Sequence, residues 1–424
     1  MHAPADARPE PLPAPAPATR RAQLALAGFF VVAAAHAWAT KALDGRDFGV
    51  LLAAGQRALH AEELYRLSDG HWCFKYSPPA ALLFAPVSLL PRRVASLLLA
   101  LGSAGALVAI FRWAAGHVGA QDRPLTHVAV VALSLPYTIH LLALGQNDAL
   151  LVALVVASEV TACRRPVFSG ALLALAFLFK PPLLIVLVVP LAWREGRRLL
   201  ACAVGLAAAS GATSLRYGLF GLAVEMRGWR ALLAATTPPL LCDQQNQSLW
   251  AVVCTYLARP EDGARYRTAV VLAGIVLLAA VGCLVLAASR EPRRRRFTWV
   301  AAALYAAALL SPLGWRTNLL AAIPLLYLLV ENARRATSRA VRRLSWSTVG
   351  VVLAVQFASY DVVGRRAFFF LLAHRHYAFA CLAAALVALL GAAIEAQHPS
   401  TPSSMPSGAT QVLPPDLAGP VTRA

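Results

Sequence analysis

Long apolar stretches recur along the whole chain, and most of them are separated by only a few polar residues. Of the 424 residues, 59% are hydrophobic and only 14% are charged, so the chain is far more apolar than an ordinary soluble domain. A helix needs about 20 mostly apolar residues to span a bilayer, and the stretches repeatedly approach this length. The sequence therefore predicts an all-α fold, that of a polytopic helical membrane protein.

The apolar stretches predict about twelve transmembrane spans, within a range of about ten to twelve. The two stretches that flank Lys180 are short, so they are predicted to be half-depth helices meeting at a break. Residues 1–20, rich in Pro and Ala, and 398–424, rich in Pro and Ser, are predicted to be disordered tails of a membrane domain at 21–397. The spans are expected at 21–40, 92–113, 126–141, 146–162, 167–180, 181–193, 198–220, 267–289, 297–312, 316–333, 345–361 and 377–395.

Arginine is concentrated in five short connections between the apolar stretches. The net charge of +19 could suggest nucleic acid, but clustering between spans favours an orientation signal, and we expect no nucleic-acid partner. Under the positive-inside rule these connections and both termini face the cytoplasm. The long loops, 41–91 and 221–266, then face outward from a plasma-membrane protein. The basic connections are 112–123, 164–165, 194–198, 290–296 and 334–343.

The first long loop contains an isolated acid, Asp47. Two stretches of this loop are apolar. The first, 47–60, is predicted to be a surface helix at the membrane interface, and the second, 78–90, is either another surface helix or the start of the next span. Asp47 begins the first, where Asp is a favoured helix cap. A carboxylate at the mouth of an apolar bundle also suits a general base, and the two roles are compatible. Asp44, three residues earlier, is expected to serve a turn.

Three of the seven cysteines lie in the predicted outer loops, where oxidation is feasible. They are Cys73, Cys242 and Cys254. Two of them could form a disulfide. The alternative is that each serves as a small apolar residue in packing.

Six short motifs follow one another along the membrane body. They are Asp47-Phe48 with Gly55 and Leu64-Tyr65; Phe74-Lys75-Tyr76-Ser77-Pro78-Pro79; Gly145-Gln146-Asn147-Asp148; Lys180-Pro181; Asn246-Gln247-Ser248-Leu249; and Ser311-Pro312-Leu313-Gly314-Trp315. In order, spacing and membrane setting they resemble glycosyltransferase family 87, the polyprenyl-phosphate-mannose-dependent alpha-mannosyltransferases. No single motif is specific, and the resemblance covers about residues 25–335.

The resemblance implies a GT-C fold, a helical bundle with its active site at the extracytoplasmic face. It also implies a lipid-phosphate sugar donor and an acid of the first outer loop as base, which is Asp47 here. The chain departs from the family after Trp315, where the family usually has a pair of histidines. This chain has Arg316-Thr317-Asn318, which puts the contacts to donor or acceptor in question.

Two cations are predicted to contact the donor phosphate. Lys180, one of only three lysines, interrupts an apolar run, where a cation at full depth costs about 2.5 to 3.5 kcal/mol unless water or an anion is near. A phosphate would supply that anion, and snorkelling from a short span is the alternative. Arg316 is the second candidate, with interfacial anchoring as its alternative.

The remaining predicted substrate-binding residues are polar or aromatic side chains of the motifs. Amides can donate to and accept from sugar hydroxyls, and aromatic rings can stack on sugar rings. For each residue a plainer role stays open, namely helix capping, an ordered turn or interfacial anchoring. These residues are Tyr65, Tyr76, Gln146, Asn147, Asn246, Ser248 and Trp315.

The chain lacks the usual signals of a nucleotide-sugar enzyme. No Asp-x-Asp pair lies in an outer loop, and no Gly-rich phosphate cradle occurs, which favours a lipid-phosphate donor. The run His374-Arg375-His376 has no apparent third ligand, and alternate residues of a helix face apart. We therefore expect neither a metal nor a cofactor.

The sequence thus predicts an integral membrane hexosyltransferase. It would move mannose or a related sugar from polyprenyl phosphate to an extracytoplasmic glycan or glycolipid, with inversion and one carboxylate as general base. An arabinofuranosyltransferase of the same fold is a close variant. The rival from another class is a transporter or flippase of a lipid-linked sugar, although the chain has only one clear broken helix where transporters often have matched pairs. A noncatalytic membrane scaffold is a third alternative.

Overall fold

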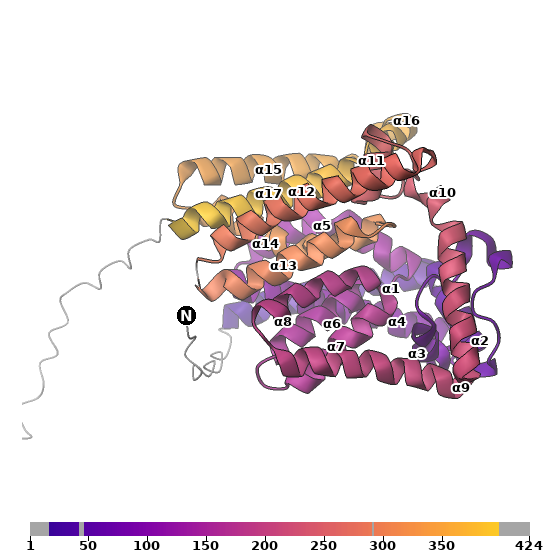
Figure 1. Cartoon of the computed structure of the whole chain (residues 1–424). Coiled ribbons are helices and arrows are strands. Elements are labelled where there is room, and N and C mark those ends of the chain that lie inside the picture. Colours follow the sequence, from indigo (N-terminus) through magenta and orange to yellow (C-terminus); the bar gives the residue numbers. More distant parts are fainter. Residues whose placement is uncertain (1–16, 42–45, 291, 398–424) are drawn as a thin grey trace, which may run out of the picture.

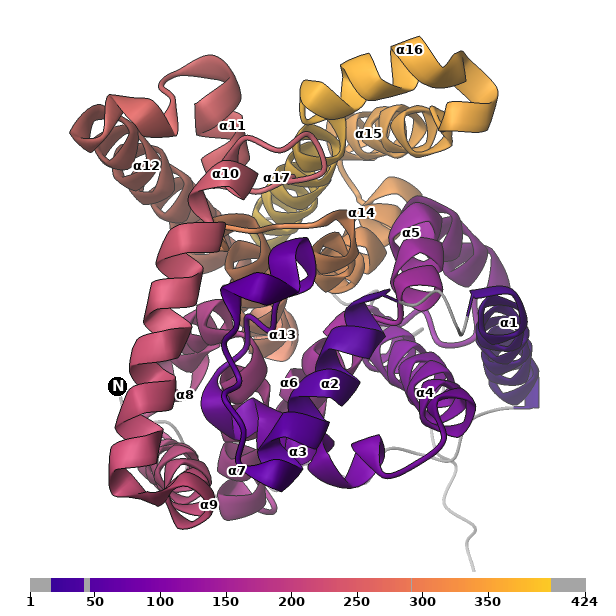
Figure 2. The same ribbon diagram turned by 90° about the vertical axis from the view of Figure 1, so that its right-hand side faces the viewer.

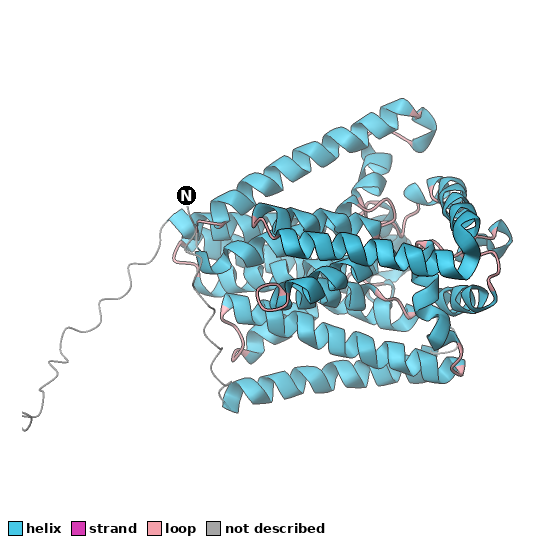
Figure 3. Ribbon diagram, turned by 60° about the horizontal axis from the view of Figure 1, so that its bottom comes forward, coloured by secondary structure: helices cyan, strands magenta, loops and turns pink. Residues whose placement is uncertain are grey.

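The computed structural model describes residues 17–41, 46–290 and 292–397, which form one helical bundle (Figures 1 and 3). No strand occurs in these three ranges, so the predicted all-α class is confirmed. Asp44 and most of the two predicted tails lie outside the described residues. The exception is the end of the N-terminal tail, residues 17–20, which begins the first helix.

Seventeen α-helices and four 3₁₀ helices are present in the described residues. In chain order they are α1 (Pro17–Lys41), α2 (Arg46–His60), η1 (Leu67–Trp72), α3 (Pro78–Ser88), α4 (Arg92–Val118), α5 (Pro124–Leu144), α6 (Asp148–Thr161), α7 (Pro166–Phe179), η2 (Pro181–Leu187), α8 (Val188–Ala192), α9 (Gly196–Thr236), α10 (Pro238–Leu241), α11 (Leu249–Tyr256), η3 (Pro260–Asp262), α12 (Ala264–Ala288), α13 (Pro292–Leu310), η4 (Arg316–Ala322), α14 (Ile323–Arg335), α15 (Arg339–Phe357), α16 (Tyr360–Ala373) and α17 (His376–Gln397).

Every predicted span coincides with a mainly helical segment, but the helices differ in length. By length and composition, six of the described helices can cross a membrane, namely α1, α4, α5, α9, α12 and α17. Counting α15 and α16 as one span, bent by 93°, gives seven. The protein is therefore a multi-pass membrane protein, and the count of about twelve stays a prediction.

The two ends of the bundle differ in character (Figure 1). At one end lie the short connections that follow α4, α6, α8, α12 and α14, together with the end of α17. We call it the arginine end, because the predicted basic connections gather there. At the other end lie α2, α3, α10, α11 and α16, and we call it the loop end. The two predicted outer loops are therefore on the same end of the bundle.

Two short helices of the first long loop pack against each other at the loop end (Figure 2). The apolar face of α2 is buried through residues such as Phe48 and Leu51, as the amphipathic pattern predicts. Gly55 is needed at the crossing, because a Cβ there would lie 2.6 Å from the backbone oxygen of Phe84 on α3. This close packing fixes the direction of α2, and with it Asp47 near its start.

The long helix α9 turns sharply and supports the same loop. Gly218 has φ +77°, a conformation that favours glycine, and the helix beyond it runs across the loop end (Figures 1 and 2). From this part Glu225 accepts a hydrogen bond from the Leu64 backbone N–H at 3.2 Å. Trp229 Nε1 donates to the Lys75 carbonyl at 2.9 Å. The middle of the first loop is thus tied to α9 at two points.

A charged network joins four segments at the arginine end. Arg198, fully buried at the start of α9, pairs with Glu159 of α6 and with Glu195, the latter at 2.9 Å. Arg296 of α13 bonds the same two carboxylates, with Nε 2.8 Å from Glu159 Oε2. Two acids and two guanidiniums balance in charge, as buried ion pairs require.

Candidate active site

A tight turn between α5 and α6 brings an amide to Asp47. Gly145 ends α5 with φ +66°, in the left-handed conformation common at helix C-termini. A Cβ at this position would also lie 3.0 Å from Phe48 Cβ. The next residue, Gln146, donates from Nε2 to Asp47 Oδ2 at 2.6 Å. The Gly145-Gln146 pair of the motif is therefore the segment that contacts the predicted base.

A second carboxylate, Asp148, lies two residues further on, in the first turn of α6. It is 6% exposed and accepts hydrogen bonds from two side chains of η4. Thr317 Oγ1 lies 3.0 Å from Oδ2, and Asn318 Nδ2 lies 3.1 Å from Oδ1. Lys180 forms an ion pair with the same Oδ1. Asp148 thus has three partners, one of them a cation.

The predicted helix break at Lys180 is confirmed. α7 ends at Phe179, Lys180 has extended backbone angles, and a 3₁₀ helix begins at Pro181. The prolines prevent the α-helix from continuing, which directs Lys180 toward α6. The anion that we expected near this lysine is present in the protein itself, as Asp148.

Thr317 joins the two carboxylates into one cluster. Its hydroxyl is within hydrogen-bonding distance of Gln146 Oε1 as well as of Asp148 Oδ2. A continuous path of polar contacts therefore runs from Asp47 through Gln146 and Thr317 to Asp148 and Lys180. We call these five residues and Asn318 the loop-end cluster. Thr317 and Asn318 occupy the positions where the resemblance implies histidines.

A pocket opens beside this cluster. Its polar wall includes Asp148, Lys180 and Asn318, and its apolar wall comes from α6, η2 and α13. Two buried polar atoms of the neighbourhood have no hydrogen-bond partner, Asn147 Nδ2 and Asn318 Oδ1. Because buried polar atoms are nearly always satisfied in folded proteins, these two are suited to meet a polar ligand.

The two predicted tyrosines have different surroundings. Tyr76 is partly buried, and its hydroxyl donates to Asn147 Oδ1 at 3.5 Å. Burial, followed by the charges of Asp148 and Asp47, raises the pKa of Tyr76 above its ordinary value, so the hydroxyl remains a donor. Tyr65 is 5% exposed and donates to the Tyr76 carbonyl at 2.7 Å. Tyr65 therefore holds the Tyr76 segment, and its contact with a sugar stays a prediction.

The two remaining motif residues of the last loop precede and begin η4. Trp315 is half-buried immediately before that helix. The guanidinium carbon of Arg316 lies 5.6 Å from the ring centre of Tyr377 and 6.0 Å from that of Phe368. Among the described residues it forms no ion pair, and its Nε is buried without a partner. Arg316 is thus a cation that lies on two aromatic rings, and its role as a phosphate ligand stays a prediction.

Asn246 and Ser248 bind the protein backbone. Asn246 is fully buried, and its Nδ2 donates to three carbonyls, including that of Pro312 at 2.9 Å. Ser248 donates to the same Pro312 carbonyl at 3.3 Å and caps α11. Both polar side chains are occupied by the protein backbone, and their role as sugar-binding residues stays a prediction. Their contacts hold the loop that leads into η4.

Three members of the cluster were absent from the predicted binding residues, namely Asp148, Thr317 and Asn318. Asp148 lies in the first turn of α6, where a carboxylate is favourable to the helix dipole, so its sequence position alone does not indicate a binding role. Thr317 and Asn318 had been noted as a departure from the family. The signal for them was their place directly after the Ser-Pro-x-x-Trp motif, where the family also puts polar side chains.

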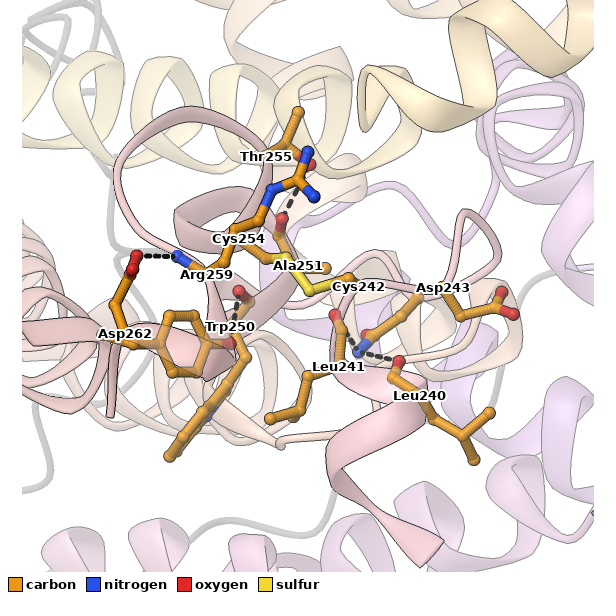
Figure 4. Close-up of a disulfide and its surroundings, with 12 residues drawn as sticks. Leu240, Leu241, Cys242, Asp243, Trp250, Ala251, Cys254, Thr255, Arg259 and Asp262 are labelled. Atoms are coloured by element: carbon orange, nitrogen blue, oxygen red, sulfur yellow. Dashed lines mark hydrogen bonds between the residues drawn. A yellow bond between two sulfur atoms is a disulfide. The ribbon is translucent and has the colours of Figure 1, made fainter. Parts of the chain in front are cut away.

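The described residues contain no group of three His, Cys, Asp or Glu side chains placed to hold a metal ion. A disulfide joins Cys242, just after α10, to Cys254 in α11 (Figure 4). It is one of the pairings that the sequence left open. Cys73 is buried and unpaired.

Comparison with known proteins assigns the family. The chain matches the model of glycosyltransferase family 87 over residues 74–313, more than half of its length. The match contains three of the six residues of the loop-end cluster, Gln146, Asp148 and Lys180, whereas Asp47 precedes it and η4, with Thr317 and Asn318, follows it. No curated protein and no solved structure matches the chain. With its spanning helices and this match, the chain belongs to glycosyltransferase family 87 and is a membrane glycosyltransferase.

Proposed function

We propose that the protein transfers mannose or a related sugar from a polyprenyl-phosphate donor to a glycan or glycolipid outside the cytoplasm, with Asp47 as general base. The observation that carries the proposal is the loop-end cluster itself. It joins Asp47 to Asp148 and Lys180 through hydrogen-bonding side chains beside a pocket. The chain that contains this cluster belongs to a glycosyltransferase family.

Of the two carboxylates, Asp47 is better suited to accept a proton. Asp148 is buried, paired with Lys180 and bonded by Thr317 and Asn318, so both of its oxygens already have partners within the protein. Asp47 is partly exposed and oriented by Gln146. A base must be held within hydrogen-bond reach of the hydroxyl it deprotonates, and this contact supplies the orientation.

The proposed reaction is a single displacement. The acceptor oxygen attacks the anomeric carbon while its proton passes to Asp47, and the bond from that carbon to the phosphate oxygen breaks. Polyprenyl phosphate departs with the electron pair, so no acid is needed to protonate it. Attack from the opposite side inverts the anomeric configuration, and a beta-linked donor gives an alpha product.

Two features support a lipid-phosphate donor. Arg316 offers a positive charge that no described carboxylate neutralises by an ion pair, and such a charge can stabilise the departing phosphate. Apolar surface lies next to the cluster, because a second pocket is lined by Trp38, Leu99 and Leu142 and ends at Phe48 and Gly145. In this arrangement Lys180 acts through Asp148 to position the cluster, and Arg316 is the phosphate ligand.

The unpaired polar atoms support a hydroxylated ligand. Asn147 Nδ2 can donate and Asn318 Oδ1 can accept, the combination that a sugar hydroxyl satisfies. Tyr76 lies beside Asn147 and would extend this surface. We assign sugar contacts to these three residues, with Gln146 and Trp315 at the edge of the site.

The proposed orientation places the loop end outside the cytoplasm. The arginine end then faces the cytoplasm with both chain termini, as the positive-inside rule requires for short basic connections. The shorter buried helices, such as α6, α7 and α14, would complete a GT-C bundle of about ten to twelve spans. The helices α2 and α3 would lie at the outer surface of the plasma membrane.

The test uses purified protein in sealed vesicles with radiolabelled polyprenyl-phosphate mannose outside and candidate glycolipid acceptors. We expect label to appear in a product that survives mild acid, which cleaves a sugar phosphate but not an ordinary glycosidic bond. A nucleoside-diphosphate sugar in place of the lipid donor should give no product.

Each alternative has a distinct outcome. Label that reaches the vesicle interior without a new glycosidic bond would contradict the proposal and favour a flippase. Transfer from an arabinofuranosyl donor but not from the mannosyl donor would correct the sugar. Protein that neither transfers nor moves label, although correctly folded, would favour the noncatalytic scaffold.

A further inference from the structure

A segment far from the proposed chemistry is tied to the loop that enters η4. We propose that the disulfide loop, residues 242–254, is a clamp that positions Thr317 and Asn318, so that catalysis depends on the Cys242–Cys254 disulfide. The inference rests on the proposed function for its catalytic consequence. The structural part of the inference, that the disulfide holds the backbone that leads into η4, can be measured without an activity assay.

The first contact of the clamp comes from Arg375, in the turn between α16 and α17. Arg375 is 3% exposed, and its guanidinium donates to the carbonyls of Cys242 at 2.8 Å, Asp243 at 2.6 Å and Asn246 at 3.0 Å. Its Nε donates to Thr255 Oγ1 at 2.9 Å. Three of these four acceptors are main-chain carbonyls, which converge on one guanidinium only while the loop keeps its folded shape.

The disulfide fixes the conformation of the loop to which Arg375 donates its hydrogen bonds. It closes the segment between Cys242 and Cys254, 12 residues apart in the chain, and ties the end of α10 to α11 (Figure 4). The carbonyl of Cys242 and the hydroxyl of Thr255, next to Cys254, are both bonded to Arg375. Removing the cross-link therefore frees both sides of the guanidinium site at once.

The second contact of the clamp reaches the loop before η4. Asn246 Oδ1 accepts from the Gly314 N–H at 2.9 Å, and the Gly314 carbonyl accepts from the Gln247 N–H at 2.6 Å. Asn246 Nδ2 also donates to the Pro312 carbonyl. A Cβ on Gly314 would lie 2.9 Å from Ser248 Cβ, so the two loops approach as closely as glycine allows. The backbone of 312–314 is thus held from two sides.

The held backbone leads directly into the cluster. Only Trp315 and Arg316 separate Gly314 from Thr317, whose hydroxyl contacts Gln146 and Asp148. A displacement of about 1 Å at catalytic groups can lower a rate as much as about a hundredfold. The clamp therefore controls the alignment of Gln146, and through it Asp47.

The experiment compares hydrogen exchange and transfer in oxidised and reduced protein. Dithiothreitol reduces the disulfide to two thiols and is itself oxidised to its cyclic disulfide, and alkylation with mass measurement confirms the reduction. We expect faster exchange of the amides of 244–248 and 313–318, and a fall in kcat of about tenfold or more. Exchange in α13 should not change, and reoxidation should restore the parent rate.

Three variants make the test independent of the reductant. Cys242→Ser with Cys254→Ser should behave as reduced protein, whereas Cys163→Ser with Cys283→Ser, at exposed unpaired cysteines, should behave as the parent. Asn246→Ala keeps the disulfide and should lower kcat with little change in KM. A direct substrate ligand would instead raise KM.

The outcomes separate the clamp from the proposed function. Unchanged exchange at 313–318 in fully reduced, folded protein would overturn the clamp. Faster exchange without transfer activity in either redox state would support the clamp and contradict the proposed function. Faster exchange with parent kcat would overturn the catalytic half of the inference.

Discussion

The two ends of the bundle each contain a cluster of buried charges, but the clusters differ in what surrounds them. At the arginine end, two guanidiniums and two carboxylates pair with one another between α6, α9 and α13. At the loop end, Lys180 pairs with Asp148, and the rest of the cluster consists of neutral hydrogen-bonding groups and Asp47 beside a pocket.

The difference distinguishes polar groups that stabilise the fold of an apolar protein from polar groups that can bind a ligand. A charge-balanced network whose members bond one another joins helices and leaves little for a ligand to do. A cluster with an oriented, partly exposed carboxylate beside a pocket has capacity left for a ligand. Substitutions at the arginine end should therefore change stability, and substitutions at the loop end should change transfer.

The largest expected effect is on stability, at the arginine end. Arg198→Leu leaves Glu159, whose side chain is buried, and the half-buried Glu195 with only Arg296 as a partner. Breaking the buried pair with Glu159 in this way costs about 3 to 5 kcal/mol. Thermal unfolding in detergent measures the loss. The control is Arg335→Leu, because the Arg335 side chain is 60% exposed in its pair with Glu331 and should matter little. Parent stability for Arg198→Leu would remove the contrast between the ends.

The next effect is on transfer, at Lys180. Lys180→Met leaves Asp148 as a buried charge that has lost its cation, so we expect kcat/KM to fall by about ten- to a hundredfold, as when a positioning group is lost. Adding Asp148→Asn removes that charge and should restore stability but not the rate. If the double variant recovered the parent activity, the ion pair between Lys180 and Asp148 would contribute only to stability.

A smaller effect is expected from Asn318→Ala. Loss of its amide removes one bond to Asp148 and the acceptor that we assign to the sugar, which together suggest a rise in KM of about tenfold. The matched control is Asn332→Ala, a buried amide bonded to the Ala388 carbonyl at 2.9 Å. That variant should lose stability and keep the parent KM. If Asn318→Ala also kept the parent KM, Asn318 would lie outside the binding surface.

The smallest effect is a pH dependence at the arginine end. Burial alone would raise the pKa of Glu195, but hydrogen bonds from Arg296 and Arg198 outweigh it and hold the pKa below its ordinary value. This carboxylate therefore adds stability above its unfolded pKa, and the contribution is lost as pH falls through the folded pKa. Glu195→Gln should lower the unfolding temperature at neutral pH, with the difference from the parent shrinking in acid. A difference that grew in acid would contradict this sign.

Much of the fold was predictable because it depends on local patterns. Apolar runs located the helices, the Pro pair after Lys180 located the break, and the basic connections marked one end of the bundle. The bend of α9 at Gly218 was not predicted, because a glycine in a helix has many uses and only its φ of +77° distinguishes this one.

The candidate site was predictable in part, and for a physical reason. Asp47, Gln146 and Lys180 stood out individually as polar residues at the edges of apolar runs. Their partners depended on contacts between distant segments, since Asp148 and Thr317 are 169 residues apart. Asn246 and Ser248 had the right chemistry for sugars, and only the structure gave their backbone partners.

The central claim, that Asp47 is the base of the transfer, is tested most directly by a single-turnover measurement. Purified Asp47→Asn is mixed with bound lipid donor and saturating acceptor, and product formation is followed beside the parent. The asparagine keeps the size of the side chain but cannot accept the proton, so the rate should fall by about a hundred- to ten-thousandfold while the donor Kd and the unfolding temperature stay near those of the parent. A parent rate in the folded variant would contradict the assignment.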